Sequence, residues 1–259
     1  MSIEQTILYK VPALLLGSII ILGAAAFAVI GIIAMRRIIH HSRLKIHNDV
    51  VDPILGAAAA VYAVLMAFVV VTVWQNFEKS NANVQLEANY MADIYRDSEA
   101  FSPEFHRDLG DLLREYRQKV ISLEWKDMAR GRMNGEVETQ MRKIWSAFTS
   151  YQPRDKAEEA FFAEAVDKLN SFRELRRQRI MDSRSGIPPL LWVVLIIGGV
   201  SIISLTFFFG AENLRVQILI SVLLAITISL MLFTIMSLDY PFTGAVSVSP
   251  EPFRAMLLD

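Results

Sequence analysis

Three of the four histidines of this chain lie close together, at His40, His41 and His47. Neutral imidazole is a common metal ligand, and its ordinary pKa lets it respond to pH near neutrality. A zinc site needs further ligands at regular spacing, and no suitably spaced carboxylate accompanies these histidines. They stand in a stretch, 36–52, that also holds four Lys or Arg residues, a composition typical of a solvated basic loop near lipid headgroups. We favour the interpretation that this stretch is a solvated basic loop, and we predict no metal site. Metal binding or pH sensing by the histidines is the alternative.

Other catalytic constellations are missing from the sequence. The chain has no cysteine, which excludes thiolate metal sites and cysteine nucleophiles. It has no Gly-rich phosphate loop and no His-Glu-x-x-His motif, and the acidic pair Glu158-Glu159 has the surroundings of a helix surface. We therefore predict no catalytic residue, no cofactor and no enzyme activity. An enzyme acting on lipids at an arginine-rich membrane face is the weakest hypothesis.

Five arginines gather near the end of a predicted helix over about 154–184. They are Arg173, Arg176, Arg177, Arg179 and Arg184. Such a cluster beside a membrane entry can bind headgroups or concentrate anions at a pore mouth. The favoured interpretation is a solvated helix face that pairs with acids of its neighbours. With a formal net charge of −1, the chain gives no reason to expect a nucleic-acid partner.

The elements that must position these residues are four apolar blocks, at about 13–35, 53–74, 188–210 and 216–237. About 20 apolar residues at ~1.5 Å each span a hydrocarbon layer of ~30 Å, so each block predicts a transmembrane helix. No block has a charged residue at its centre, which disfavours ion-coupled transport but is compatible with a passive pore. The predicted fold is an all-α membrane protein whose bilayer-embedded spans flank a soluble helical domain at 75–187, followed by a tail at 238–259.

Helical patterns fill the predicted soluble domain. The second span is expected to continue as a polar helix to about residue 100. Ser102 and Pro103 have the residue types of an N-cap and a first helical position, so a new helix is expected there. Pro153 ends a third, shorter helix, and the helix over 154–184 follows.

The second span has two contrasting faces. Small residues share one face, at Gly56, Ala60, Ala63 and Ala67. Small side chains let two helix backbones approach closely in lipid. The opposite face carries bulkier residues, which are apolar within the span and polar near its end. They include Val61, Leu65, Phe68, Thr72 and Gln75. If several copies ringed an axis, Leu65 and Phe68 would form a hydrophobic neck with a wetted mouth beyond it. The alternative is a stripe that faces lipid or helices of the same chain.

Several short motifs resemble a known family of bacterial membrane proteins, the bestrophin-like family. They include Val70-Val71-Thr72-Val73-Trp74-Gln75 at the second span, Glu87-Ala88-Asn89 just after it, Glu124-Trp125, and Leu238-Asp239-Tyr240-Pro241-Phe242-Thr243-Gly244 after the fourth span. The resemblance covers about residues 50 to 250. The family often has a basic residue where this chain has Tyr240. Asp239 precedes a tight turn, where its carboxylate can cap backbone donors or pair with Arg96 or Arg184, so a structural role is expected for this motif.

This resemblance implies a distant, architectural relation to bestrophins, which are pentameric anion channels with a neck on the second span and a cytoplasmic helical domain. By that analogy we expect a homo-oligomer, pentameric and conducting anions such as chloride, with Leu65, Phe68 and Thr72 in the neck. The basic loop 36–52 and the five arginines give opposing topology signals. The analogy favours a bacterial inner membrane with the helical domain and both termini in the cytoplasm.

A second hypothesis belongs to another functional class. The predicted helices between Glu78 and Arg184 are rich in charged residues. Such helices are also typical of a membrane-anchored scaffold or sensor that binds a partner through its helical domain and conducts no ions. The oligomeric state separates the two hypotheses, because a monomer or dimer leaves no room for a central pore.

Overall fold

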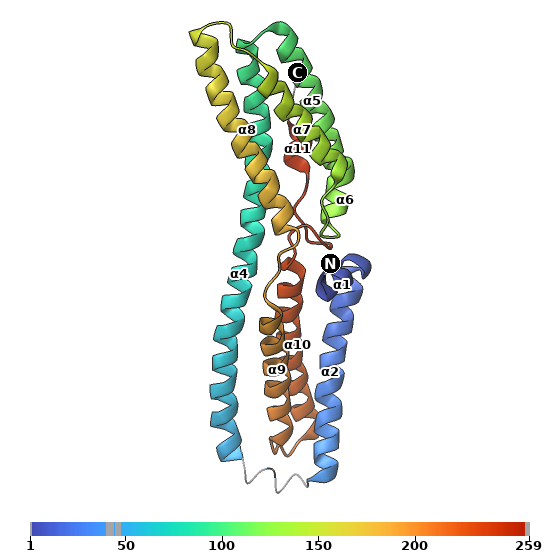
Figure 1. Ribbon diagram of the computed structural model, residues 1–259. Coiled ribbons are helices and arrows are strands. Elements are labelled where there is room, and N and C mark those ends of the chain that lie inside the picture. Colours follow the sequence, from blue (N-terminus) through green and yellow to red (C-terminus); the bar gives the residue numbers. More distant parts are fainter. Residues whose placement is uncertain (1, 40–43, 45–47, 257–259) are drawn as a thin grey trace. The chain divides into compact units, whose positions relative to one another are not determined.

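The computed structural model describes residues 2–39, 44 and 48–256, and these residues form an all-helical fold (Figure 1). The α-helices are α1 (Ile3–Lys10), α2 (Ala13–Ile38), α4 (Asn48–Asp97), α5 (Pro103–Lys119), α6 (Trp125–Met128), α7 (Gly135–Ser150), α8 (Lys156–Asp182), α9 (Pro189–Leu205), α10 (Leu214–Leu238) and α11 (Glu251–Ala255). Among the residues that the structure describes, four helical segments are long and apolar enough to cross a membrane, at Ala13–Ile38, Asn48–Ala100, Pro189–Phe208 and Leu214–Leu238. The all-α membrane fold that the sequence predicted is confirmed.

The chain divides into two compact units. The membrane unit comprises Lys10–Gln75 and Gly186–Asp239, and the soluble unit comprises Met1–Tyr9, Asn76–Ser185 and Tyr240–Asp259. The long helix α4 supplies residues to both. The first residues and the tail thus belong to the soluble unit, which the sequence did not predict.

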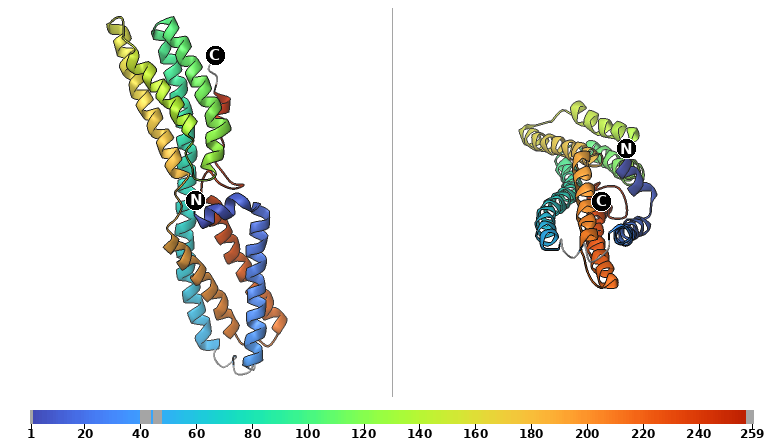
Figure 2. Two further views of the ribbon diagram at one scale, coloured as in Figure 1. Left: turned by 45° about the vertical axis from the view of Figure 1, so that its right-hand side comes forward. Right: turned by 90° about the horizontal axis from the view of Figure 1, so that it is seen from below.

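In the membrane unit, α2 and α10 pack along each other, and Figure 2 shows them side by side in both views. Glycines on α2 permit close approach by aromatic side chains: a Cβ atom at Gly17 would lie 3.3 Å from the Phe233 ring, and one at Gly31 would lie 2.2 Å from the Phe207 ring. At the far end of this packing, Arg36 donates to the side chain of Gln217 over 2.7 Å and to the carbonyl of Ala211.

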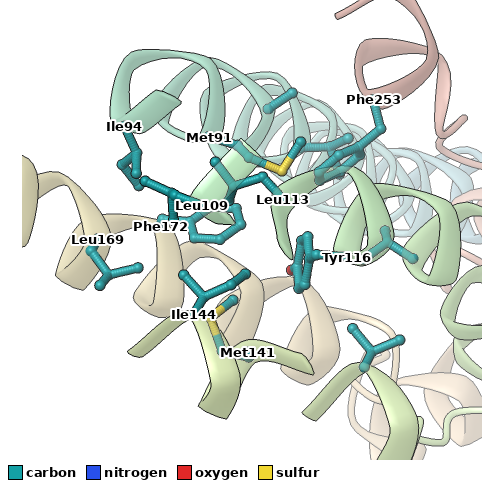
Figure 3. Packing of buried hydrophobic residues seen from close by; sticks show 14 of the residues in the cluster. Met91, Ile94, Leu109, Leu113, Tyr116, Met141, Ile144, Leu169, Phe172 and Phe253 are labelled. Atoms are coloured by element: carbon teal, nitrogen blue, oxygen red, sulfur yellow. The ribbon is translucent and has the colours of Figure 1, made fainter. Parts of the chain in front are cut away.

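In the soluble unit, α5, α7 and α8 each begin at a side-chain cap. The Ser102 hydroxyl accepts from the Phe105 amide, Asn134 caps α7, and Asp155 caps α8, so the first free amide groups of these helices are satisfied. The apolar faces of α4, α5, α7 and α8 meet in one core (Figure 3), whose labelled residues include Met91, Leu113, Ile144 and Phe172.

A π-helical turn, Val120–Glu124, joins α5 to α6. Such turns insert one extra residue per turn and often occur at functional sites. Here the turn places Glu124 in the interior of the soluble unit, where its side chain is fully buried.

Candidate functional site

The residues predicted for a neck lie on an uncovered face of α4. Val61 and Phe68 are 74% and 70% exposed, Thr72 and Gln75 are exposed, and Leu65 is half-buried. The Thr72 hydroxyl donates to the carbonyl of Phe68 over 2.8 Å, so it is satisfied within the helix. The described helices of this chain therefore leave most of the stripe open.

The small-residue face of α4 is open as well. Gly56, Ala60, Ala63 and Ala67 are all exposed, and a Cβ atom added at Gly56 would meet nothing within 4 Å. In lipid a surface of this kind favours a second helix, because close backbone approach strengthens packing.

The third face of α4 packs within the chain. Tyr62, Met66, Val69 and Val73 are buried, and the Tyr62 hydroxyl donates to the carbonyl of Leu195 on α9 over 2.8 Å. At about 100° per residue, the buried, small and bulky faces of α4 lie roughly 120° apart. Each face of this span thus has its own surroundings.

A cluster of buried charged side chains lies in the core of the soluble unit. Arg179 on α8 is fully buried, and its Nε and Nη2 atoms donate to the Glu87 carboxylate over 2.6 and 2.9 Å. Nη2 also donates to Glu124 over 2.9 Å. Arg176 donates to the same Glu124 carboxylate over 2.6 and 3.2 Å, and the Tyr116 hydroxyl donates to Glu87 over 3.0 Å.

The electrostatics of this cluster keep its arginines charged. Burial opposes the charge on Arg179, but Glu87 and Glu124 outweigh burial and raise its pKa above the ordinary value. Burial, with the nearby Glu87 charge, raises the pKa of the Tyr116 hydroxyl well above its usual value, so Tyr116 acts as a neutral donor. The two buried arginines face two buried glutamates, and Arg176 also pairs with the partly exposed Glu138, so the cluster is a structural arrangement and no acid–base pair.

The surroundings of the five arginines, four on α8 and Arg184 just beyond its end, were only partly predicted. Arg173, Arg177 and Arg184 are exposed, as expected for a solvated face. Arg176 and Arg179 do pair with acids of neighbouring helices, but they are buried, and the prediction of a solvated face was wrong for these two. The physical reason is their spacing along the helix. Both arginines lie on the same face of α8 as the buried residues Leu169 and Phe172.

Sequence reasoning missed the ion pair between Glu87 and Arg179. The spacing Leu169, Phe172, Arg176, Arg179 continues the apolar face of α8 with two arginines, and this signal could have revealed their burial. Their acidic partners could not be identified, since Glu87 and Glu124 come from two other parts of the chain.

The motif residues around Trp125 pack against the tail. Trp125 donates its indole N–H to the carbonyl of Val248 over 3.0 Å, and its ring meets Phe242 edge-on at a centroid distance of 5.8 Å. The Arg179 guanidinium lies 5.0 Å from the Trp125 ring centroid. Phe253 of α11 is buried beside them.

The remaining motif residues shape the chain after α10. In the soluble unit, Pro241 accepts from the Val248 amide over 2.7 Å, and Gly244 adopts φ of +93°, a left-handed conformation that favours glycine. In the membrane unit, the Asp239 carboxylate accepts from the Ile187 amide over 2.7 Å and from the Trp192 indole over 3.3 Å. It thereby ties the end of α10 to the start of α9.

No group of three or more metal-ligating side chains occurs among the residues that the structure describes. His40, His41 and His47 lie outside those residues.

Comparisons of the sequence and of the structure with known proteins point to the same family. A family model described as a Bestrophin-like domain matches residues 22–253. Among solved structures, a variant of a bacterial Bestrophin homolog from Klebsiella pneumoniae is 12% identical, covers 91% of this chain and 94% of its own, and superposes with a TM-score of 0.69. Another structure of a bacterial Bestrophin homolog from the same organism is 11% identical, covers 90% and 93%, and has a TM-score of 0.66. At these identities the structures show a shared fold. None of the curated proteins matches the sequence.

Proposed function

Because the chain belongs to the Bestrophin-like family, we propose that it forms a homo-oligomeric, anion-conducting channel whose second span, on α4, lines a hydrophobic neck. The assembly is a pentamer that carries chloride across a bacterial inner membrane, with the helical domain and both termini in the cytoplasm. Val61, Leu65, Phe68, Thr72 and Gln75 face the axis.

The three faces of α4 carry this proposal. A helix in a ring has one side toward its own chain, one toward the neighbouring copy and one toward the axis. The buried face around Tyr62 supplies the first side, the open small face around Ala63 supplies the second, and the bulky stripe around Phe68 supplies the third. A helix that faced only lipid would need no such division.

The composition of the axial stripe supports permeation through it. Val61, Leu65 and Phe68 are apolar and narrow a passage by excluding water, while Thr72 and Gln75 are polar and wet the exit. A side chain such as Phe68 restricts flux by its bulk and its apolar surface, so trimming it widens the passage.

Ion flux into liposomes tests the proposal. Purified protein is reconstituted, and chloride and potassium gradients are imposed separately. Native protein is expected to carry chloride, and Leu65→Ala and Phe68→Ala are expected to raise the flux. Ile197→Ala on α9 is the matched control, because Ile197 is 61% exposed but lies on another span.

Each of the other outcomes of this experiment would refute a separate part of the proposed function. An absence of flux from folded protein, or a monomeric or dimeric state in detergent, would overturn the channel and favour a membrane-anchored scaffold. Potassium flux would keep the pore and overturn anion conduction. Equal flux from native protein and both neck variants would overturn the neck assignment.

A further inference from the structure

Tyr62 of α4 lies in a notch of α9 within the membrane unit. Its side chain is buried, and its hydroxyl donates to the carbonyl of Leu195 over 2.8 Å. A Cβ atom at Gly198 would lie 2.7 Å from the Tyr62 ring, and one at Gly199 would lie 3.0 Å from the Tyr62 hydroxyl oxygen. The two consecutive glycines of α9 thus leave the space that the tyrosine fills.

The hydrogen bond of Tyr62 is directional and hard to replace in lipid. A helix carbonyl accepts the amide four residues later, which for Leu195 is that of Gly199. Its oxygen has a second lone pair, which is free to accept the tyrosine hydroxyl as well. Because an unpaired hydroxyl in an apolar environment is costly, the notch and the carbonyl together favour one placement of Tyr62.

The apolar contacts on the same face of α4 are less specific. Met66, Val69 and Val73 are also buried there. Lipid tails are as apolar as these side chains, so such contacts give little preference for one rotation of a helix over another. The polar contact of Tyr62 therefore specifies the rotation of α4.

A second polar contact holds the beginning of α4. The Asn48 side chain donates to the carbonyl of Gly210 over 3.2 Å and accepts from the amide of the same residue over 2.8 Å. Tyr62 lies about 21 Å farther along the helix, in the middle of the span. It thus holds the part of α4 that carries the proposed neck.

The proposed neck residues lie to one side of this contact. At about 100° per residue, Phe68 lies roughly 120° from Tyr62 around the helix, and Ala67 lies roughly 140° from Tyr62 in the opposite sense. The rotation that Tyr62 specifies therefore decides whether a bulky or a small side chain faces a given direction.

We propose that Tyr62 is a positioning residue of the channel, whose hydrogen bond to the Leu195 carbonyl holds the bulky stripe of α4 toward the axis. The inference rests on the proposed function. Tyr62 touches no permeating ion in this proposal and acts through Leu65 and Phe68.

Removal of the Tyr62 hydroxyl should raise the chloride flux into liposomes. In Tyr62→Phe the ring still fills the notch, but the bond to Leu195 is lost, so α4 turns more freely. Ala67 then replaces Phe68 at the axis part of the time. Interhelical hydrogen bonds in membranes shift an equilibrium by roughly threefold, and we expect a rise in flux of about that size.

A second variant disrupts the same contact from α9. Gly199→Ala keeps Tyr62, but the added methyl group displaces its hydroxyl from the Leu195 carbonyl. We expect a rise of about threefold alone and no further rise in Tyr62→Phe/Gly199→Ala, because that variant has no hydroxyl to displace. Ser229→Ala is the control, since this buried hydroxyl donates over 2.7 Å to Ala225 of its own helix, and it should leave the flux unchanged.

Cysteine labelling reports the rotation of α4 directly. The chain has no cysteine, so one introduced cysteine gives one labelling site. Ala67→Cys should react slowly with a water-soluble methanethiosulfonate reagent, and roughly threefold faster when combined with Tyr62→Phe. Ile197→Cys, at an exposed position of α9, should stay equally unreactive with and without Tyr62→Phe.

The refuting outcomes are distinct from failure of the channel proposal. Native or lower flux from Tyr62→Phe would overturn the role of Tyr62 and leave the channel intact, even if the Tm falls as for a purely structural contact. Effects that multiply to about ninefold in the double variant would show that the two residues act separately and would overturn it too. If native protein carries no chloride, the proposed function itself is wrong, and this inference with it.

Discussion

Removal of the buried Arg179 should destabilise the soluble unit strongly. Arg179 makes three charge-assisted hydrogen bonds of 2.6 to 2.9 Å to Glu87 and Glu124, and all three side chains are fully buried. In Arg179→Met, Arg176 still pairs with Glu124, but the buried Glu87 loses its arginine, so its negative charge is uncompensated. Breaking a buried pair from one side costs about 3 to 5 kcal/mol of unfolding free energy. For a protein of this size that lowers the Tm by roughly 10 °C.

The double variant Glu87→Gln/Arg179→Met tests the reason for this loss. It removes one charge of each sign, so Glu124 and Arg176 still balance each other. We expect it to recover much of the stability that Arg179→Met loses, a coupling of about 2 kcal/mol or more. Thermal unfolding in detergent, followed by far-ultraviolet circular dichroism, measures both variants.

An exposed pair supplies the control. Arg177 and Glu174 form an ion pair whose side chains are 70% and 57% exposed. Such pairs contribute about 0 to 1 kcal/mol, so Arg177→Met should shift the Tm by no more than about 3 °C. The reasoning is refuted if Arg179→Met behaves like Arg177→Met, or if the losses in the double variant simply add.

Three further substitutions probe other contacts. Gly198→Leu should cost about 1 to 3 kcal/mol by overpacking, measured as a lower Tm, because a Cβ atom there would lie 2.7 Å from the Tyr62 ring. Hydrogen bonds from Arg154 lower the pKa of Glu158 to about 2, so this carboxylate stabilises the fold above its unfolded pKa of about 4.3. That stability is lost as pH falls toward 2, so the Tm deficit of Glu158→Gln at pH 7 should disappear over this range. Gln5→Leu should speed hydrogen–deuterium exchange in α1, because the buried Gln5 amide donates to two groups of the soluble unit over 2.9 and 3.2 Å.

The long helices could be predicted because their signals are local. A membrane-spanning segment needs about 20 apolar residues, and the α10 span predicted at 216–237 is observed at Leu214–Leu238. The start of α5 was equally readable, because Ser102 and Pro103 have the residue types that satisfy a helix start. These features depend on neighbours within one or two turns.

Contacts between distant segments could not be predicted in the same way. Helix α1 has only eight residues, too few for a stable isolated helix, and contacts such as those of Gln5 to Ser183 and Thr243 hold it in the soluble unit. The tail is similar, since Phe253 is buried against Trp125 by a packing that no local pattern indicates. Sequence periodicity shows which face of a helix is apolar but leaves its partner open.

The buried cluster also explains how α8 is held in one rotation within the soluble unit. One residue of helix rotates a side chain by about 100°, so a shift of α8 by a single residue would turn Arg176 and Arg179 away from their partners. The bidentate pair between Arg179 and Glu87 fixes that rotation against α4, because a planar guanidinium fork accepts few geometries. Buried ion pairs add little net stability but can specify one arrangement. In this protein the arrangement so specified keeps Leu169 and Phe172 of α8 in the core of the soluble unit, while Arg173 and Arg177 stay exposed.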